Sequence, residues 1–147
     1  MKKYMFFLPI GDWSRDGHEK CDYKIVISNK SVEEVREIHF KARDTLPFSI
    51  EEICCVYQDQ KIDKEMFEII KSTGLDPENY FYYHDYAGKE VWDMEWNTDA
   101  MAELWIDWLK LVDPDLELEI KDLEMIPFYG RDKKNRHISF VGYGLFD

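Results

Sequence analysis

The sequence predicts an α+β fold, with a mainly antiparallel sheet of about five or six strands and three or four helices packed against it. Segments in which apolar residues have helical spacing recur along the chain, and several of them follow a capping residue. Short runs rich in β-branched and aromatic residues lie between them. With 147 residues, of which 45% are hydrophobic, the chain is expected to form a single compact domain over residues 1–147.

The first two predicted elements are strands, residues 3–10 and 23–28, which are expected to pair with each other. The apolar run near the start is short and is broken by Pro9, and no small-residue cleavage site follows it. These features favour a strand over a signal peptide. No stretch of the sequence approaches the length of a membrane span, so no membrane association is expected.

Two capping boxes predict where helices begin. Ser31 and Glu34 have the spacing in which each side chain bonds the other residue's backbone amide, and the helix after them should continue to about Thr45. The segment Ser49–Glu52 repeats this pattern. The apolar residues of 50–57 have helical spacing, although the β-branched centre of this segment would also suit a strand.

A third helix is expected over residues 63–73, followed by a hairpin. Its two strands are predicted at residues 80–84 and 90–96, on either side of a turn at residues 85–88. A short helix opened by Asp76-Pro77 is the alternative for the first of these strands.

The clearest helix is predicted over residues 97–112. Its tryptophans and other apolar residues lie along one face, while Asp99, Glu103 and Asp107 recur every four residues on the other. Like charges at this spacing are mildly unfavourable for folding, and a partner surface would explain them. A half-exposed strand is expected at residues 116–120, and a long final strand at residues 137–146.

The acidic residues are concentrated in one window of the chain. The formal net charge is −12, and residues 72–120 contribute −11 of it, from thirteen acidic residues and two lysines. Such a surface repels phosphate backbones, so direct nucleic-acid binding is not expected, whereas a basic protein would be attracted. The alternative is that the acidic residues serve only solubility.

The cysteines indicate the compartment. They are odd in number, and two of the three are adjacent, which does not suit a secreted disulfide framework. A reducing, cytoplasmic location is therefore expected.

The best functional hypothesis is a non-enzymatic acidic binding or inhibitor protein, of the immunity type or a nucleic-acid mimic, that engages a basic protein partner. The predicted contacts are acidic residues that alternate with aromatic ones: Asp93, Glu95, Asp99, Glu103 and Asp107. A homo-oligomer, formed through the tryptophan-bearing face of the 97–112 helix, is a further hypothesis.

The segment from Gly11 to Cys21 is open to three interpretations. It is a structured hairpin loop, a recognition loop, or a site for metal or acid–base chemistry. As a recognition loop it would use Trp13 and Arg15 as anchors.

As a metal site, the Gly11–Cys21 segment would use His18 and Cys21 as ligands. The acid–base candidates are Asp12, Asp16 and His18, with His84 approaching from elsewhere in the chain. The alternative function is therefore a small metal-assisted hydrolase built around Asp12, His18 and Cys21. His-x-x-Cys alone is a weak signal, and no cofactor is predicted.

No established catalytic or nucleotide-binding motif is present in the sequence. There is no glycine-rich phosphate loop and no nucleophile elbow. The segment His137-Ile-Ser139 resembles one arm of the His-x-Ser/Thr motif of the two-histidine phosphoesterases. That family needs two such motifs, and no other histidine of this chain has Ser or Thr at the second position after it.

Overall fold

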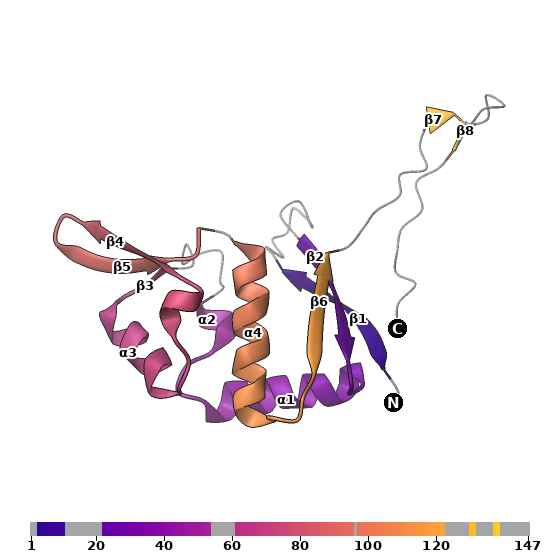
Figure 1. Ribbon diagram of the computed structural model, residues 1–147, viewed down its shortest axis with the longest axis horizontal. Coiled ribbons are helices and arrows are strands. Elements are labelled where there is room, and N and C mark those ends of the chain that lie inside the picture. Colours follow the sequence, from indigo (N-terminus) through magenta and orange to yellow (C-terminus); the bar gives the residue numbers. More distant parts are fainter. Residues whose placement is uncertain are drawn as a thin grey trace.

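The computed structural model describes residues 3–10, 22–53, 61–95, 97–122, 130–131 and 137–138. Over these ranges the chain is α+β, with four α-helices and two antiparallel sheets of three strands (Figure 1). In chain order the elements are β1 (Tyr4–Ile10), β2 (Asp22–Ser28), α1 (Val32–Thr45), α2 (Ile50–Ile53), β3 (Lys61–Ile62), α3 (Lys64–Ser72), the 3-10 helix η2 (Pro77–Asn79), β4 (Tyr82–Tyr86), β5 (Lys89–Asp93), α4 (Thr98–Val112), β6 (Leu118–Asp122), β7 (Gly130–Arg131) and β8 (His137–Ile138).

The first sheet has the strand order β1-β2-β6, and both strand pairs are antiparallel. The predicted pairing of the first two strands is confirmed, with Phe6 opposite Val26. Val26 is fully buried and also lies opposite Ile120 of β6. The predicted strand at residues 116–120 begins two residues later than expected, at Leu118.

The local signals for helix starts are confirmed. The Ser31 hydroxyl accepts a hydrogen bond from the Glu34 amide, and the Glu34 carboxylate accepts one from the Ser31 amide, which completes the capping box of α1. Asp63 caps α3 by accepting from the Met66 amide at 2.9 Å. Helix α2 covers residues 50–53, and the remainder of the predicted 50–57 element lies outside the described residues.

The second sheet has the order β3-β5-β4, so β4 lies at its edge. The predicted hairpin is confirmed, but its turn is shorter than expected, because residues 82–86 pair with residues 89–93 and only Ala87 and Gly88 connect them. The alternative helix at Asp76-Pro77 also forms, as η2, and the strand then starts at Tyr82.

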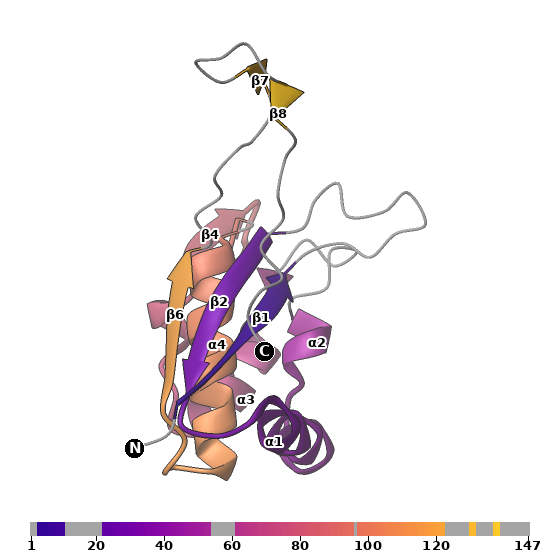
Figure 2. The ribbon, with the colours of Figure 1, turned by 90° about the vertical axis from the view of Figure 1, so that its right-hand side faces the viewer.

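The expectation of a single sheet of five or six strands is not confirmed. Helix α4 stands between the two sheets, which therefore remain separate (Figures 1 and 2). Seven of its residues, spread over more than one face, are buried. Because α4 has buried side chains on several sides, it lies between the two sheets, and their strands do not pair with each other.

The tryptophans of α4 belong to the core. Trp108 is 0% exposed, and its indole nitrogen donates to the Phe48 carbonyl at 3.1 Å. Trp105 is also buried and donates to Nδ1 of His39, whose Nε2 lies 2.7 Å from the Glu51 carboxylate. The monomer therefore buries these two tryptophans itself, and a homo-oligomer through this face of α4 stays a hypothesis.

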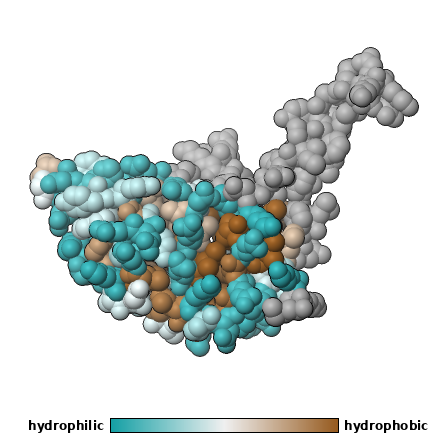
Figure 3. Space-filling view, in the orientation of Figure 1, coloured by the Kyte–Doolittle hydropathy of each residue, from teal (hydrophilic) through white to brown (hydrophobic). Residues whose placement is uncertain are grey.

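Hydrophobic side chains at the surface gather around α4 and the first sheet, whereas hydrophilic and intermediate ones cover the β4–β5 hairpin (Figure 3). No helix in the described ranges has both the length and the apolar character that a membrane span requires. Strands β7 and β8 pair with each other, with Gly130 opposite Ile138. The rest of the predicted final strand, residues 139–146, lies outside the described residues.

Candidate functional site

The edge strand β4 carries most of the exposed large aromatic side chains that the structure describes. Tyr82 is 60% exposed, and Tyr83 and Tyr86 are about half exposed. Within the described residues, Phe40 on α1 is the only other large hydrophobic side chain that is exposed. Aromatic rings gathered at a surface are typical of contact sites, so this strand is a candidate recognition surface.

The hairpin is held by its two-residue turn. Ala87 and Gly88 both have positive φ angles, 54° and 85°, as a type I′ turn requires. The Asp85 carboxylate accepts a hydrogen bond from the Gly88 amide at 2.8 Å. The turn fixes the register of β4 against β5, and the register decides which side chains share a face.

One face of the hairpin packs on the core. Trp92 is buried there, with its ring centroid 4.4 Å from that of Phe67 on α3. Tyr83, directly opposite Trp92, meets it edge-on and places its hydroxyl 3.5 Å from the Glu90 carboxylate. Desolvation and the negative charges of Glu90 and Asp85 raise the pKa of the Tyr83 hydroxyl, which reflects the acidic surroundings.

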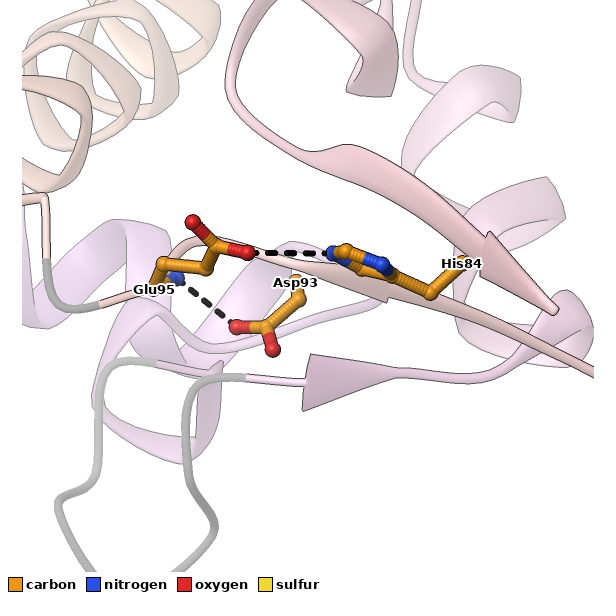
Figure 4. Close-up of side chains that lie close together, drawn as sticks. All are labelled: His84, Asp93 and Glu95. Carbon is orange, nitrogen blue, oxygen red and sulfur yellow. Dashed lines mark hydrogen bonds and ion pairs between the residues drawn. The ribbon is translucent and has the colours of Figure 1, made fainter. Parts of the chain in front are cut away.

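The other face brings His84, Asp93 and Glu95 together (Figure 4). His84 lies opposite Val91, so Asp93 is its diagonal neighbour on the same face. Nε2 of His84 lies 3.2 Å from Oε1 of Glu95, and Oδ1 of Asp93 accepts from the Glu95 amide at 2.7 Å. One nitrogen or oxygen ligand atom from each residue lies within 4.8 Å of the other two.

Two features of this cluster are unusual. Asp93 is 7% exposed, yet none of the ion pairs among the described residues includes it. Glu95 has a φ of 51°, which is uncommon for a residue with a side chain and costs about 1–2 kcal/mol. Glu95 has this unfavourable φ at the position from which its carboxylate reaches His84. Strained positions of this kind concentrate at functional sites.

A hollow of about 150 Å³ adjoins Tyr82 at the start of α4. Its lining contains Tyr80, Asn97 and three acidic side chains, those of Glu78, Asp99 and Glu103. The described residues that line the hollow include no lysine or arginine. Acidic residues and tyrosines therefore lie side by side here, as they do on the hairpin.

The Tyr80 hydroxyl donates to Asp107 at 2.5 Å. Burial, followed by that hydrogen bond and by the negative charges of Asp107, Glu103 and Asp76, raises the pKa of the Tyr80 hydroxyl. The negative charges at this surface therefore add to the effect of burial on this pKa.

The five predicted acidic contacts differ in their environments. Glu95 and Glu103 are exposed, whereas Asp93 is buried. Asp99 is 71% exposed at its side chain and pairs with Lys24, whose Nζ lies 2.7 Å away. Asp107 accepts from Tyr80. Two of the five therefore also hold the fold together, Asp99 by tying β2 to α4 and Asp107 by tying η2 to α4.

The Gly11–Cys21 candidates lie outside the described residues: Asp12, Trp13, Arg15, Asp16, His18 and Cys21. The three interpretations of that loop consequently stay predictions. His84, which the hydrolase hypothesis brought toward the loop, lies beside Asp93 and Glu95.

Sequence reasoning missed the three tyrosines of β4 as site residues. The available signal was the high aromatic fraction of 16%, which suggested that some rings lie at a surface. The aromatic fraction did not indicate which kind of ring would be exposed. Three tyrosines are exposed, whereas Trp92, Trp105 and Trp108 are buried. Comparison with protein-family models, with curated proteins and with solved structures found no match for this chain.

Proposed function

We propose that this chain is a non-enzymatic binding protein that engages a basic protein through the tyrosine–acid surface. We define this surface as the exposed side chains on both faces of the edge strand β4, together with the acidic residues beside them: Tyr82, Tyr83, Tyr86, Glu90, Glu95 and Glu103. The observation that carries the proposal is the exposure of three tyrosines on one edge strand in acidic surroundings.

Tyrosine suits recognition because it offers a large, semi-rigid contact area with a hydroxyl at its tip. Its ring also attracts cations. The chain contains one such contact on this surface, since Nζ of Lys61 lies 5.7 Å from the centroid of the Tyr86 ring. Arginines or lysines of a partner would find the same kind of contact at Tyr82 and Tyr83.

The acidic residues would act over a longer range than the tyrosines. A surface of one charge steers an oppositely charged partner and raises the rate of association, while packed aromatic residues lower the rate of dissociation. This combination fits an inhibitor of a basic enzyme, either an immunity-type protein or a mimic of nucleic-acid charge. The cysteine content supports a cytoplasmic site of action.

A capture experiment tests the proposal. The tagged chain is incubated with an extract of its native cells at about 0.1 M salt and again at about 1 M, where the Debye length falls from about 10 Å to about 3 Å. We expect a partner with an isoelectric point above about 9 whose retention falls at high salt. The variant Tyr82→Thr/Tyr83→Thr/Tyr86→Thr should lose the partner.

Two matched variants serve as controls. Phe40→Gln removes an exposed aromatic ring from α1, and Glu33→Gln/Glu37→Gln removes two exposed charges from the same helix. Both should retain the partner. Equal capture by the tyrosine variant, or an acidic partner, would contradict the proposal.

Competition with duplex DNA separates the two classes of inhibitor. A mimic of nucleic-acid charge occupies the site that the partner uses for DNA, so DNA should displace it. An immunity-type protein that binds elsewhere should stay bound.

A further inference from the structure

We propose that His84, Asp93 and Glu95 form a binding site for a divalent first-row transition-metal ion such as Zn²⁺. The proposal goes beyond the partner-binding function and does not depend on it. It differs from the sequence-based hypothesis of a site at His18 and Cys21, because its ligands come from β4, β5 and the turn after β5.

The spacing of the donor atoms fits such an ion. With bonds of about 2.0–2.1 Å, neighbouring ligand atoms around a tetrahedral zinc ion lie about 3.3 Å apart. Nε2 of His84 and Oε1 of Glu95 are 3.2 Å apart, so this pair already has the required separation. The ligand atoms of all three residues lie within 4.8 Å of one another.

The hydrogen bond to Asp93 supports the same assignment. Carboxylates that bind metals are usually held by a further hydrogen bond, which orients them toward the ion. The Glu95 amide donates to Oδ1 of Asp93 at 2.7 Å, and no hydrogen bond or ion pair between described residues engages the second carboxylate oxygen. Glu95 thus contacts Asp93 through its amide and His84 through its carboxylate (Figure 4).

Charge provides the second, independent argument. A buried carboxylate is costly unless it is paired with a cation. Asp93 is more than nine-tenths buried, and among the described residues no lysine or arginine pairs with it. The exposed Glu95 adds a second negative charge beside it. A divalent cation at this position would neutralise both carboxylates.

The donor set selects the class of ion. One imidazole and two carboxylates suit zinc and its first-row neighbours better than Mg²⁺ or Ca²⁺, which prefer six or more oxygen ligands. Three protein ligands leave a fourth tetrahedral position for water or for a side chain from another molecule. The cluster is partly exposed, at His84 and Glu95, so that position is accessible.

Calorimetric titration of the chelator-treated full chain with ZnCl₂ tests the site. We expect one Zn²⁺ per chain, with affinity reduced at least tenfold in His84→Ala and in Glu95→Gln. These two positions decide the question because they are not buried, whereas a change at Asp93 would also disturb folding. Glu90→Gln is the matched control, since it removes one exposed charge from the same hairpin and should bind Zn²⁺ as the parent does.

The three cysteines are the competing zinc ligands, so Cys21→Ser/Cys54→Ser/Cys55→Ser is titrated alongside. The proposal requires this variant to keep its zinc. Histidine side-chain NMR gives a second measurement: of the four histidines, His84 should show the largest change on addition of ZnCl₂. Absence of binding at millimolar Zn²⁺, or undiminished binding by His84→Ala and Glu95→Gln, would overturn the proposal.

Discussion

Strands β2 and β4 both carry aromatic and charged residues, but their environments are opposite. In the described part of β2, Lys24, Val26 and Ser28 are buried in alternation with half-buried residues, because the strand lies at the centre of its sheet. In β4 no residue is buried, because the strand lies at an edge. Packing therefore determines which side chains β2 can carry, whereas the side chains of β4 are available for binding.

The two kinds of large aromatic residue divide in the same way. Among the described residues the tryptophans and Tyr80 lie in the core, whereas Tyr82, Tyr83 and Tyr86 are exposed on the edge strand. The stability of the fold should thus depend on the first region and the proposed partner contact on the second. Substitutions in each region can separate these contributions.

The largest effect is expected in the core. Trp108→Ala should lower the free energy of unfolding by about 3–5 kcal/mol, because it opens a cavity and leaves the Phe48 carbonyl without its donor. Tyr82→Thr should change it by no more than about 0.5 kcal/mol, since the side chain is mainly exposed. Urea denaturation measures both. If both substitutions lower the free energy of unfolding equally, the proposed difference between core and edge strand is wrong.

A smaller effect is expected at Tyr80, where core and acidic surface meet. Tyr80→Phe should cost about 1–1.5 kcal/mol, because the hydrogen bond to Asp107 is lost. Its measurement is a comparison of urea midpoints at neutral pH.

Tyr80 should also make stability depend on alkaline pH. The hydroxyl has an ordinary pKa of 10.0 when unfolded and a higher one when folded, so the folded state holds the proton more tightly. The stabilisation is complete below pH 10.0 and decreases as the pH rises above it. Thermal unfolding of the parent and of Tyr80→Phe should therefore converge with rising alkaline pH, and a constant difference would contradict this assignment.

The capping box of α1 should contribute about as much as one hydrogen bond. Ser31→Ala removes the acceptor for the Glu34 amide and should cost about 1 kcal/mol. Ser31→Asp is the matched control, because aspartate also caps helices and should retain most of the stability. Urea unfolding of the three proteins checks this ranking.

The smallest effect, opposite in sign, is expected in the hairpin turn. Ala87→Gly should stabilise the chain by about 0.5 kcal/mol, since glycine adopts a positive φ without the penalty that alanine has. The gain should appear as a slightly higher melting temperature, with partner capture unchanged. A loss of stability would indicate that the Ala87 methyl group has a packing role.

Local signals in the sequence predicted most elements correctly. The Ser31–Glu34 capping box, the Asp63 cap and the amphipathic 97–112 helix all depend on residues close in sequence. The split into two sheets could not be predicted, because it depends on α4 being buried on several sides. The apolar stripe of α4 was predicted, but not that a second sheet forms on the other side of the helix.

The candidate site was predicted only in part. His84, Asp93 and Glu95 were each named, but in different roles, and their convergence follows from the register of the hairpin. The sequence suggested a turn over residues 85–88, whereas the structure turns at Ala87 and Gly88 alone. That difference decides which residue of β5 is the diagonal neighbour of His84.

The two-residue turn also determines which changes of length the hairpin can tolerate. One residue inserted after Ala87 would shift β4 against β5 by one position and reverse the faces of one strand relative to the other. His84 would then no longer share a face with Asp93, and Tyr83 would leave the core side beside Trp92. Relatives that keep this fold of the hairpin should therefore vary in the turn only among residues that adopt a positive φ, and not in the number of turn residues.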